Sequence, residues 1–315
     1  MKKIGLAGVL ILLLILGTVS CGKTEQIRLA TGGSAGTYYA YGSAVSQILN
    51  EKTSIPITVQ STGASRANIQ LLNAGEVELA IVQNDVMDYA WRGVDLFNGE
   101  KINSFNTMAA LYAEVCQVVA NPATGIKTIA DLKGKNVSVG DAGSGVEFNA
   151  KQILDAYGIS FNDIQKQNLS FNASADALRD SKIDAFFCVA GAPTPAVVDL
   201  ATNREIALLE VDEAHATQLI RKYPFYTRFP VVAGSYKGQT ADVMTVAVKA
   251  TFIVSTKVSD DTVYKLTKAL FENKTTIAAA HAKGKELSTS YAVEGISVPF
   301  HPGAAKYFKE IGALK

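Results

Sequence analysis

Short apolar runs that break into small polar loops, and then into helical patterns, recur along this chain. Each run is rich in strand-forming residues, and each following loop is built mainly from Gly, Ser, Thr and Ala. Alternation of strand, loop and helix is typical of a parallel sheet covered by helices, an α/β fold. Ligands bind at the carboxyl ends of strands in such sheets, so these loops are the first candidates for a site. The runs and their loops are residues 27–30 before 31–37, 57–59 before 61–65, 136–139 before 140–145, and 185–189 before 190–193.

Helical periodicity follows most of the loops. Apolar residues recur three and four positions apart, which places them on one face of a helix. Residues 79–82 form an apolar run that predicts a buried strand delivering Gln83 and Asn84 to its end, whereas residues 225–238, rich in Pro, Gly and Tyr, predict a loop. The predicted helices cover residues 38–49, 66–73, 128–132, 146–157, a segment opening near Pro193 or Pro195, and a segment capped by Ser259.

The length of the chain predicts two lobes. A single core rarely supports more than about 250 residues, and the layout of the first part is repeated after residue 121. Two long β runs, residues 111–120 and 245–254, are expected to cross between the lobes and return the C-terminal helices to the first one. We therefore expect residues 26–117 and 246–315 in lobe 1 and residues 118–245 in lobe 2, each a mostly parallel sheet flanked by helices.

The N-terminus has the pattern of an export signal. Lys2 and Lys3 precede an apolar run over residues 4–19, which is shorter than the roughly 20 residues of a membrane-spanning helix. Residues 1–21 are therefore expected to be a signal segment that ends at Cys21, and its apolar run is expected to leave the mature protein. The segment Thr18-Val19-Ser20-Cys21-Gly22 resembles the lipobox of bacterial lipoproteins, with Thr18 where that pattern usually has Leu. We expect an extracytoplasmic protein held to the membrane only by a lipid on Cys21, and cleavage without lipidation is the alternative.

Composition and charge remove several function classes. The 48% hydrophobic and 19% charged residues are those of an ordinary globular protein. The formal net charge of +1 becomes −1 without Lys2 and Lys3, so we expect no nucleic-acid partner. Three cysteines are too few for a disulfide scaffold. Cys116 and Cys188 lie in apolar runs that favour small buried thiols, and whether they pair is left open.

The loops are suited to hold a small anion. A small-residue loop that opens into a helix presents backbone N–H groups at the positive end of the helix dipole, and its hydroxyls add donors. Arg66 is either a clamp for a carboxylate or a solvated side chain of a first helical turn. The candidate ligand-binding residues are Ser34, Gly36, Thr37, Tyr38, Ser61, Asn68, Gln83, Asn84, Ser144, Gly145, Val146, Ala190, Gly191 and Tyr236.

Other chemistries fit the residues less well. Gly32, Gly33 and Gly36 miss the first spacing of a dinucleotide fingerprint. Ala142-Gly143-Ser144-Gly145-Val146 carries the serine of a hydrolase elbow, but both outer glycines of that motif are replaced. His215, His281 and His301 have no metal-binding spacing, and the helix dipole accounts for Asp141 and Glu147 at a helix start. We expect no catalytic residue, no metal and no cofactor.

Five motifs in order give the chain a resemblance to a known family. Together they look like the TAXI family of solute receptors for TRAP transporters, over about residues 27–273. The region after Tyr236 departs from the pattern. The motifs are Thr31-Gly-Gly-Ser-Ala-Gly-Thr-Tyr-Tyr39, Ser61-Thr-Gly-Ala-Ser-x-x-Asn68, Ala130-Asp-Leu-Lys-Gly-Lys-x-Val137, Gly140-Asp-x-Gly-Ser-Gly145 and Ala233-Gly-Ser-Tyr236.

The resemblance implies both a fold and a function. The fold is similar to type II periplasmic binding proteins, in which two α/β lobes close on a ligand. The implied function is capture of glutamate or a 2-oxoglutarate-like dicarboxylate and its delivery to the subunits of a TRAP permease, without enzymatic activity. We expect a monomer. Two alternatives stay open, an exported α/β hydrolase and a lipid-anchored ligand sensor that has no permease.

Overall fold

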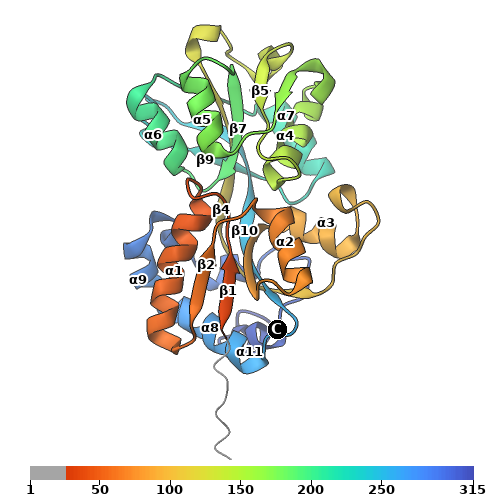
Figure 1. The fold of residues 1–315 in the computed structure, drawn as a ribbon, viewed down its shortest axis with the longest axis vertical. Helices are drawn as coiled ribbons and strands as arrows, with labels where there is room; N and C mark the ends of the chain where they lie inside the picture. Colours follow the sequence, from red (N-terminus) through yellow and green to blue (C-terminus); the bar gives the residue numbers. More distant parts are fainter. Residues whose placement is uncertain (1–25) are drawn as a thin grey trace, which may run out of the picture.

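The computed structural model describes residues 26–315, which form two halves joined by two long strands (Figure 1). The strands are β1 Ile27–Ala30, β2 Ile57–Gln60, β3 Leu79–Gln83, β4 Phe105–Ala120, β5 Asn136–Ser138, β6 Gln165–Gln167, β7 Ala185–Ala190, β8 Ala207–Leu209, β9 Thr227–Val231 and β10 Val243–Ser255. The helices are α1 Thr37–Thr53, α2 Ser65–Ala74, α3 Asn84–Arg92, α4 Gly145–Ala156, α5 Phe171–Arg179, α6 Pro195–Asn203, α7 Glu213–Lys222, α8 Asp260–Glu272, α9 Lys274–Ala280, α10 Thr289–Val293 and α11 Pro302–Glu310. Short 3-10 turns are η1 Asp95–Phe97, η2 Pro122–Thr124, η3 Ile129–Leu132, η4 Phe161–Asp163 and η5 Ala282–Glu286.

The strands form one mixed sheet with the order β2-β1-β3-β10-β4-β7-β5-β6. In one half β1 pairs in parallel with β2 and β3, and in the other β5 pairs in parallel with β6 and β7. The long strands β4 and β10 run antiparallel to each other from Phe105 opposite Ser255 to Val115 opposite Ala247. This central pair joins the two parallel groups, while β8 and β9 pair with its far ends.

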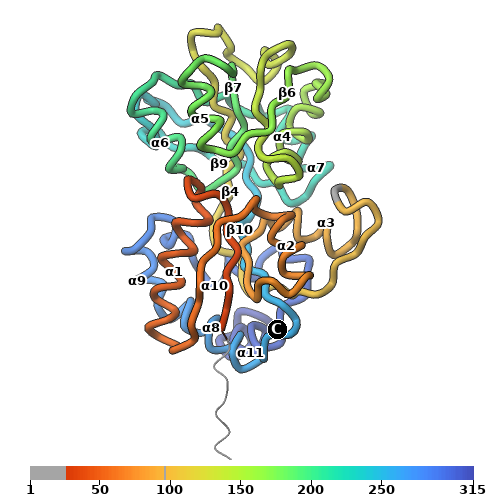
Figure 2. The backbone as a smooth tube through the Cα atoms, in the orientation of Figure 1, coloured from red at the N-terminus to blue at the C-terminus, as the bar shows by residue number. Residues whose placement is uncertain are grey.

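Helices cover both faces of the sheet in the first half. On one face α1, α8 and α11 bury Tyr41, Leu270 and Phe308, and on the other face α2 and α3 bury Ile69 and Val86. The C-terminal helices pack beside α1, far away in sequence, because β10 returns the chain to this half (Figure 2). Burial of these apolar side chains, not local helix propensity, supplies most of the stability of such helices.

The second half repeats the same plan. On one face α4 and α7 bury Ile153 and Leu219, and on the other face α5 and α6 bury Leu178 and Leu200. Ser144 and Ser170 cap α4 and α5 by accepting the N–H groups of Glu147 and Ala173. The predicted fold class, two lobes of mostly parallel strands flanked by helices and joined by two crossing strands, is confirmed.

The prediction of a loop over residues 225–238 is wrong in part. Residues Thr227–Val231 form β9, which pairs antiparallel with β10 and places Phe229 opposite Thr245. Pro230 lacks an N–H group, and β9 tolerates it because β10 is its only strand partner among the described residues. The helix α3 was not predicted either, since it begins at Asn84 directly after β3 without a loop.

The described residues include two of the three cysteines but not the expected export signal. Cys116 on β4 and Cys188 on β7 are buried free thiols. The expected export signal and the lipidation site Cys21 lie outside the described residues. Within residues 26–315, none of the helices combines the length and the apolar character needed to cross a bilayer.

Replacing Leu270 with Ala tests the packing of the C-terminal helices onto the first half. Leu270 on α8 is fully buried, so the variant should lose about 2 to 5 kcal/mol of unfolding free energy through lost burial and the cavity left behind. Urea denaturation followed by circular dichroism measures this loss. Val198→Ala, at an exposed position of α6, is the control and should change stability by less than about 0.5 kcal/mol. Equal effects of the two substitutions would contradict the packing.

Candidate functional site

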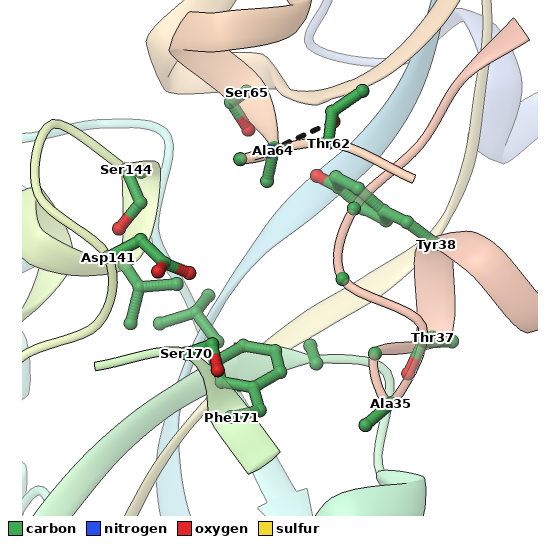
Figure 3. Close-up of a pocket in the computed structure, with 18 of the residues that line it drawn as sticks. Ala35, Thr37, Tyr38, Thr62, Ala64, Ser65, Asp141, Ser144, Ser170 and Phe171 are labelled. Carbon is green, nitrogen blue, oxygen red and sulfur yellow. Dashed lines mark hydrogen bonds between the residues drawn. The ribbon is translucent and has the colours of Figure 1, made fainter. Parts of the chain in front are cut away.

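A cavity of about 210 Å³ lies between the two halves, beside the central strands. Figure 3 shows Ala35, Thr37 and Tyr38 on one side of it and Asp141, Ser144 and Phe171 on the other. Hydroxyls, backbone and small side chains make up most of its wall. The lining residues are Gly32, Gly33, Ser34, Ala35, Gly36, Thr37, Tyr38, Ser61, Thr62, Gly63, Ala64, Ser65, Gln83, Glu114, Asp141, Ser144, Gly145, Val146, Ser170, Phe171, Asn172, Val189 and Ala190.

The N-termini of four helices, two from each half, meet at this cavity. The first residues of α1, α2, α4 and α5 (Thr37, Ser65, Gly145 and Phe171) all line it. The starts of α1 and α2 have no side-chain cap, so N–H groups of their first turns are free to bind a ligand. Each N-terminus carries a partial positive charge. Together they favour an anionic or strongly accepting group in the cavity.

The loop before α2 holds a strained residue at the cavity wall. Ala64 has φ 64° and ψ −148°, a backbone conformation that costs an L-residue of order 1 to 3 kcal/mol. Its N–H donates to Thr62 Oγ1 at 3.1 Å, and Thr62 Oγ1 donates to Asn68 Oδ1 at 2.5 Å. The buried Asn68 side chain in turn donates to the carbonyls of Thr31 and Ile81. Asn68 therefore holds the loop in place and does not itself line the cavity.

A buried carboxyl group lies in the wall of the cavity on β4. Glu114 is 2% exposed, and its Oε2 accepts a hydrogen bond from the Tyr38 hydroxyl at 2.7 Å. Burial raises the pKa of Glu114 to about 8, although the Tyr38 hydrogen bond and the charge of Lys283 oppose the shift. Burial also raises the pKa of the Tyr38 hydroxyl well above its usual value. Glu114 is thus mostly protonated at neutral pH.

Cationic side chains are absent from the wall formed by the described residues. The lining contains Glu114 and Asp141 but no Lys, Arg or His. Partial burial raises the pKa of Asp141 from its usual value. Arg66 lies 5.9 Å above the Phe97 ring, outside the lining residues. The described residues also contain no group of His, Cys, Asp or Glu side chains that could hold a metal ion.

Direct hydrogen bonds join the two halves beside the cavity. Thr37 Oγ1 donates to the carbonyl of Gly191 at 2.9 Å, and the Ala196 N–H donates to the carbonyl of Ala35 at 3.3 Å. Glycine at position 191 permits this close approach, because a Cβ would lie 2.8 Å from Thr37 Cγ2 and would force that side chain to shift. These neutral contacts are each worth about 1 kcal/mol. These two contacts alone therefore hold the halves together only weakly.

A buried polar network that begins at Gln83 also joins the two halves. Gln83 Nε2, from the end of β3, donates to Asn149 Oδ1 on α4 at 2.8 Å. Asn149 Nδ2 donates to Asp85 Oδ2 at 3.0 Å and to the Tyr226 hydroxyl at 2.6 Å. Gln83 Oε1 is buried without a partner among the described residues and packs against Gly145, where a Cβ would lie 1.6 Å away. The network couples residues of both halves and reaches the cavity wall at Gln83.

The structure brings most of the predicted site residues together. Ten of them line the cavity, namely Ser34, Gly36, Thr37, Tyr38, Ser61, Gln83, Ser144, Gly145, Val146 and Ala190. Four others do not line it. Asn68 supports the loop before α2, Asn84 Oδ1 accepts the N–H of Lys249, Gly191 accepts the Thr37 hydroxyl, and the buried Tyr236 hydroxyl contacts Gln117 and the N–H of Thr194.

Sequence reasoning missed two parts of the cavity. Ser170, Phe171 and Asn172 at the start of α5 follow β6, whose three residues are exposed and polar, so no apolar run marks that strand. A Ser before a helical pattern was the available signal. Glu114 was also missed, although a single acidic residue inside the apolar run of β4 is a visible departure from the pattern. Charged residues are almost never fully buried unless they have a specific partner or role.

Replacing Asp85 with Asn tests the buried network through pH. Burial raises the pKa of Asp85 to about 6 from 3.8. The folded protein then binds more protons than the unfolded chain between about pH 4 and 6, so the wild type loses stability as pH rises through this window. Asn does not titrate, and the stability of the variant relative to wild type should rise by about 3 kcal/mol across the window and stay constant above it. Urea denaturation at several pH values measures this, and a difference independent of pH would contradict it.

Several solved structures have a fold similar to that of this chain. The aliphatic sulphonate binding protein SsuA of Escherichia coli superposes with a TM-score of 0.52 at 16% identity, covering 90% of this chain and 83% of SsuA. PhnD1 of Prochlorococcus marinus, solved with methylphosphonate, superposes with a TM-score of 0.58 at 8% identity, covering 92% of this chain and all of PhnD1. A putative L-cystine ABC transporter protein of Listeria monocytogenes matches at 0.53 and 16% identity, over 84% of this chain and 98% of that one. These likenesses establish the fold. The family model that matches this chain, over residues 29–312, is that of the NMT1-like family, and the chain belongs to this family.

Proposed function

We propose that this chain is an extracytoplasmic solute-binding receptor that captures a small organic anion between its two halves. The observation that carries the proposal is the meeting of four helix N-termini, two from each half, around one cavity. Only a ligand that touches both sides gains from bringing the halves together, and its differential affinity for the closed arrangement is what drives closure. The likeness in fold to a sulphonate binding protein, to a protein solved with methylphosphonate and to a putative L-cystine ABC transporter protein supports this class of function.

Glutamate and 2-oxoglutarate-like dicarboxylates are the proposed ligands, and a TRAP-type permease is the proposed recipient. Both follow from the resemblance of the motifs to TAXI receptors. Three proteins of similar fold are named for ABC transporters, so the energy source of the permease is the point to test. Uptake into vesicles that carry the cognate permease should follow an imposed ion gradient. Uptake that requires ATP instead would overturn the TRAP assignment.

An enzymatic role has little support in the cavity. Several serine and threonine hydroxyls line it, but no His or Lys among the described lining residues is available as a base to activate one of them. The proposed localisation is the outer face of the membrane, with the lipid on Cys21 as anchor. A receptor that senses its ligand without a permease has the same binding site and differs only in its partners.

A thermal-shift screen of amino acids, dicarboxylates, phosphonates and sulfonates tests binding. A specific ligand at about 100 times its Kd should add roughly 2.7 kcal/mol to the unfolding free energy and raise the Tm accordingly. Absence of any shift across the screen would overturn the proposed ligand class.

Two cavity variants then test the site by calorimetry with the ligand found. Thr37→Ala removes a hydroxyl that contacts the opposite half, and Ser144→Gly removes a cavity hydroxyl while keeping most of the capping strength at α4. Each should weaken binding about five- to tenfold, the value of one hydrogen bond. Thr202→Ala, whose hydroxyl bonds within the exposed part of α6, is the matched control and should leave the Kd unchanged. Unchanged affinity in both cavity variants would place the site elsewhere.

A further inference from the structure

One carboxyl group in the cavity wall has one oxygen engaged by the protein and the other open to the cavity. The carboxyl of Glu114 is 2% exposed and lines the cavity from β4. Its Oε2 accepts from the Tyr38 hydroxyl at 2.7 Å, and no other side-chain hydrogen bond engages this carboxyl among residues 26–315. Glu114 Oε1 is not among the fully buried unpartnered atoms, so it is open to the cavity, where a ligand can reach it.

The charged surroundings of Glu114 favour its neutral form. Lys283 on η5 is the nearby cation, but its Nζ is engaged by Glu286 Oε1 at 2.6 Å. Asp85 on α3 adds negative charge. The remaining titratable neighbours are neutral at pH 7, because burial raises the pKa of each of them. They are the hydroxyls of Tyr38, Tyr112 and Tyr291 and the thiols of Cys116 and Cys188.

A neutral carboxyl in this position can donate a hydrogen bond to a ligand. With Oε2 accepting from Tyr38, the proton of the neutral carboxyl belongs on Oε1, where it is available to a ligand acceptor. An anion bound at the four helix N-termini supplies acceptor oxygens in the same cavity. An ionised Glu114 would instead repel that anion, and no Lys, Arg or His in the described lining would offset the repulsion.

We propose that Glu114 is a specificity-determining residue that donates its own proton to an acceptor oxygen of the bound anion. Tyr38 is the positioning residue, because its hydroxyl occupies Oε2 and leaves Oε1 for the ligand. The proposal rests on the proposed function and adds to it a substrate feature, a keto, carboxylate, phosphonate or sulfonate oxygen that lies against β4. Ligand affinity then depends on the protonation of the receptor itself.

Infrared spectroscopy of the unliganded protein tests the protonation separately from binding. The C=O stretch of a protonated carboxyl should be present at pH 7, be lost in Glu114→Gln, and disappear as pH rises through about 8. Tyr38→Phe should move that disappearance to higher pH, because the Tyr38 hydrogen bond favours the ionised form. A wild-type protein without this band at pH 7 overturns the proposal.

Calorimetric titration with 2-oxoglutarate, L-glutamate, methylphosphonate and methanesulfonate tests the donor role. Glu114→Gln keeps a neutral donor of similar shape, so its Kd should stay within about threefold of wild type at pH 7. Glu114→Leu should bind about tenfold or more weakly. Wild-type affinity should fall up to about tenfold per pH unit above 8, and that dependence should vanish in Glu114→Gln.

The control removes the other cavity carboxyl. Asp141→Asn should keep the loss of affinity above pH 8. If Glu114→Gln abolishes binding, or wild-type affinity rises with pH, an ionised Glu114 pairs with a ligand cation such as an ammonium and the donor role is overturned. If none of the four probes binds the wild type, the proposed function fails together with the donor role. If they bind with unchanged affinity in Glu114→Gln and Glu114→Leu alike, only the donor role fails.

Discussion

The antiparallel pairing of β4 with β10 is the constraint on which the rest of the structure depends. Each half contributes its own parallel strands to this central pair, β3 next to β10 and β7 next to β4. The pair is therefore the part of the sheet that both halves share, and it fixes which loops face each other. Its register shifts between Ala250 and Thr251 and again between Phe252 and Ile253. Such irregularities bend and twist a ladder, which suits strands that pass from one half to the other.

The contacts between the halves are of the kind that a small ligand can outweigh. Beside the cavity they are hydrogen bonds between neutral groups, such as Thr37 to Gly191 and Gln83 to Asn149. Close approach there depends on small residues, because a Cβ at Gly145 or Gly191 would collide with the opposite half. A few contacts of about 1 kcal/mol each leave the balance between open and closed arrangements sensitive to a ligand that adds several more.

The electrostatics of the cavity come from backbone and burial more than from charged side chains. Helix N-termini supply positive potential, and they do so without the free-energy cost of desolvating a guanidinium or ammonium group. Glu114, mostly neutral at pH 7, does not cancel that potential and adds a donor. Asp141 lies in the wall across from Tyr38 and is better solvated than Glu114 (Figure 3). Recognition in such a site depends on the direction of hydrogen bonds, which distinguishes ligands by where their acceptor oxygens lie.

The sequence by itself determined the local elements and three of the four loops that form the cavity. Apolar runs, small-residue loops and helical spacing are properties of neighbouring residues, so β1 with α1, β2 with α2 and β5 with α4 were predictable. It did not reveal β9, whose pairing depends on β10, or the loop before α5, whose strand β6 is polar and exposed. Only the tertiary structure decided that Asn68, Asn84 and Tyr236 bond to neighbouring segments and do not line the cavity. It also decided that Glu114 lines the cavity. The direction in which a side chain points and the burial of a carboxyl are set by contacts between segments distant in sequence, and local pattern carries no information on those contacts.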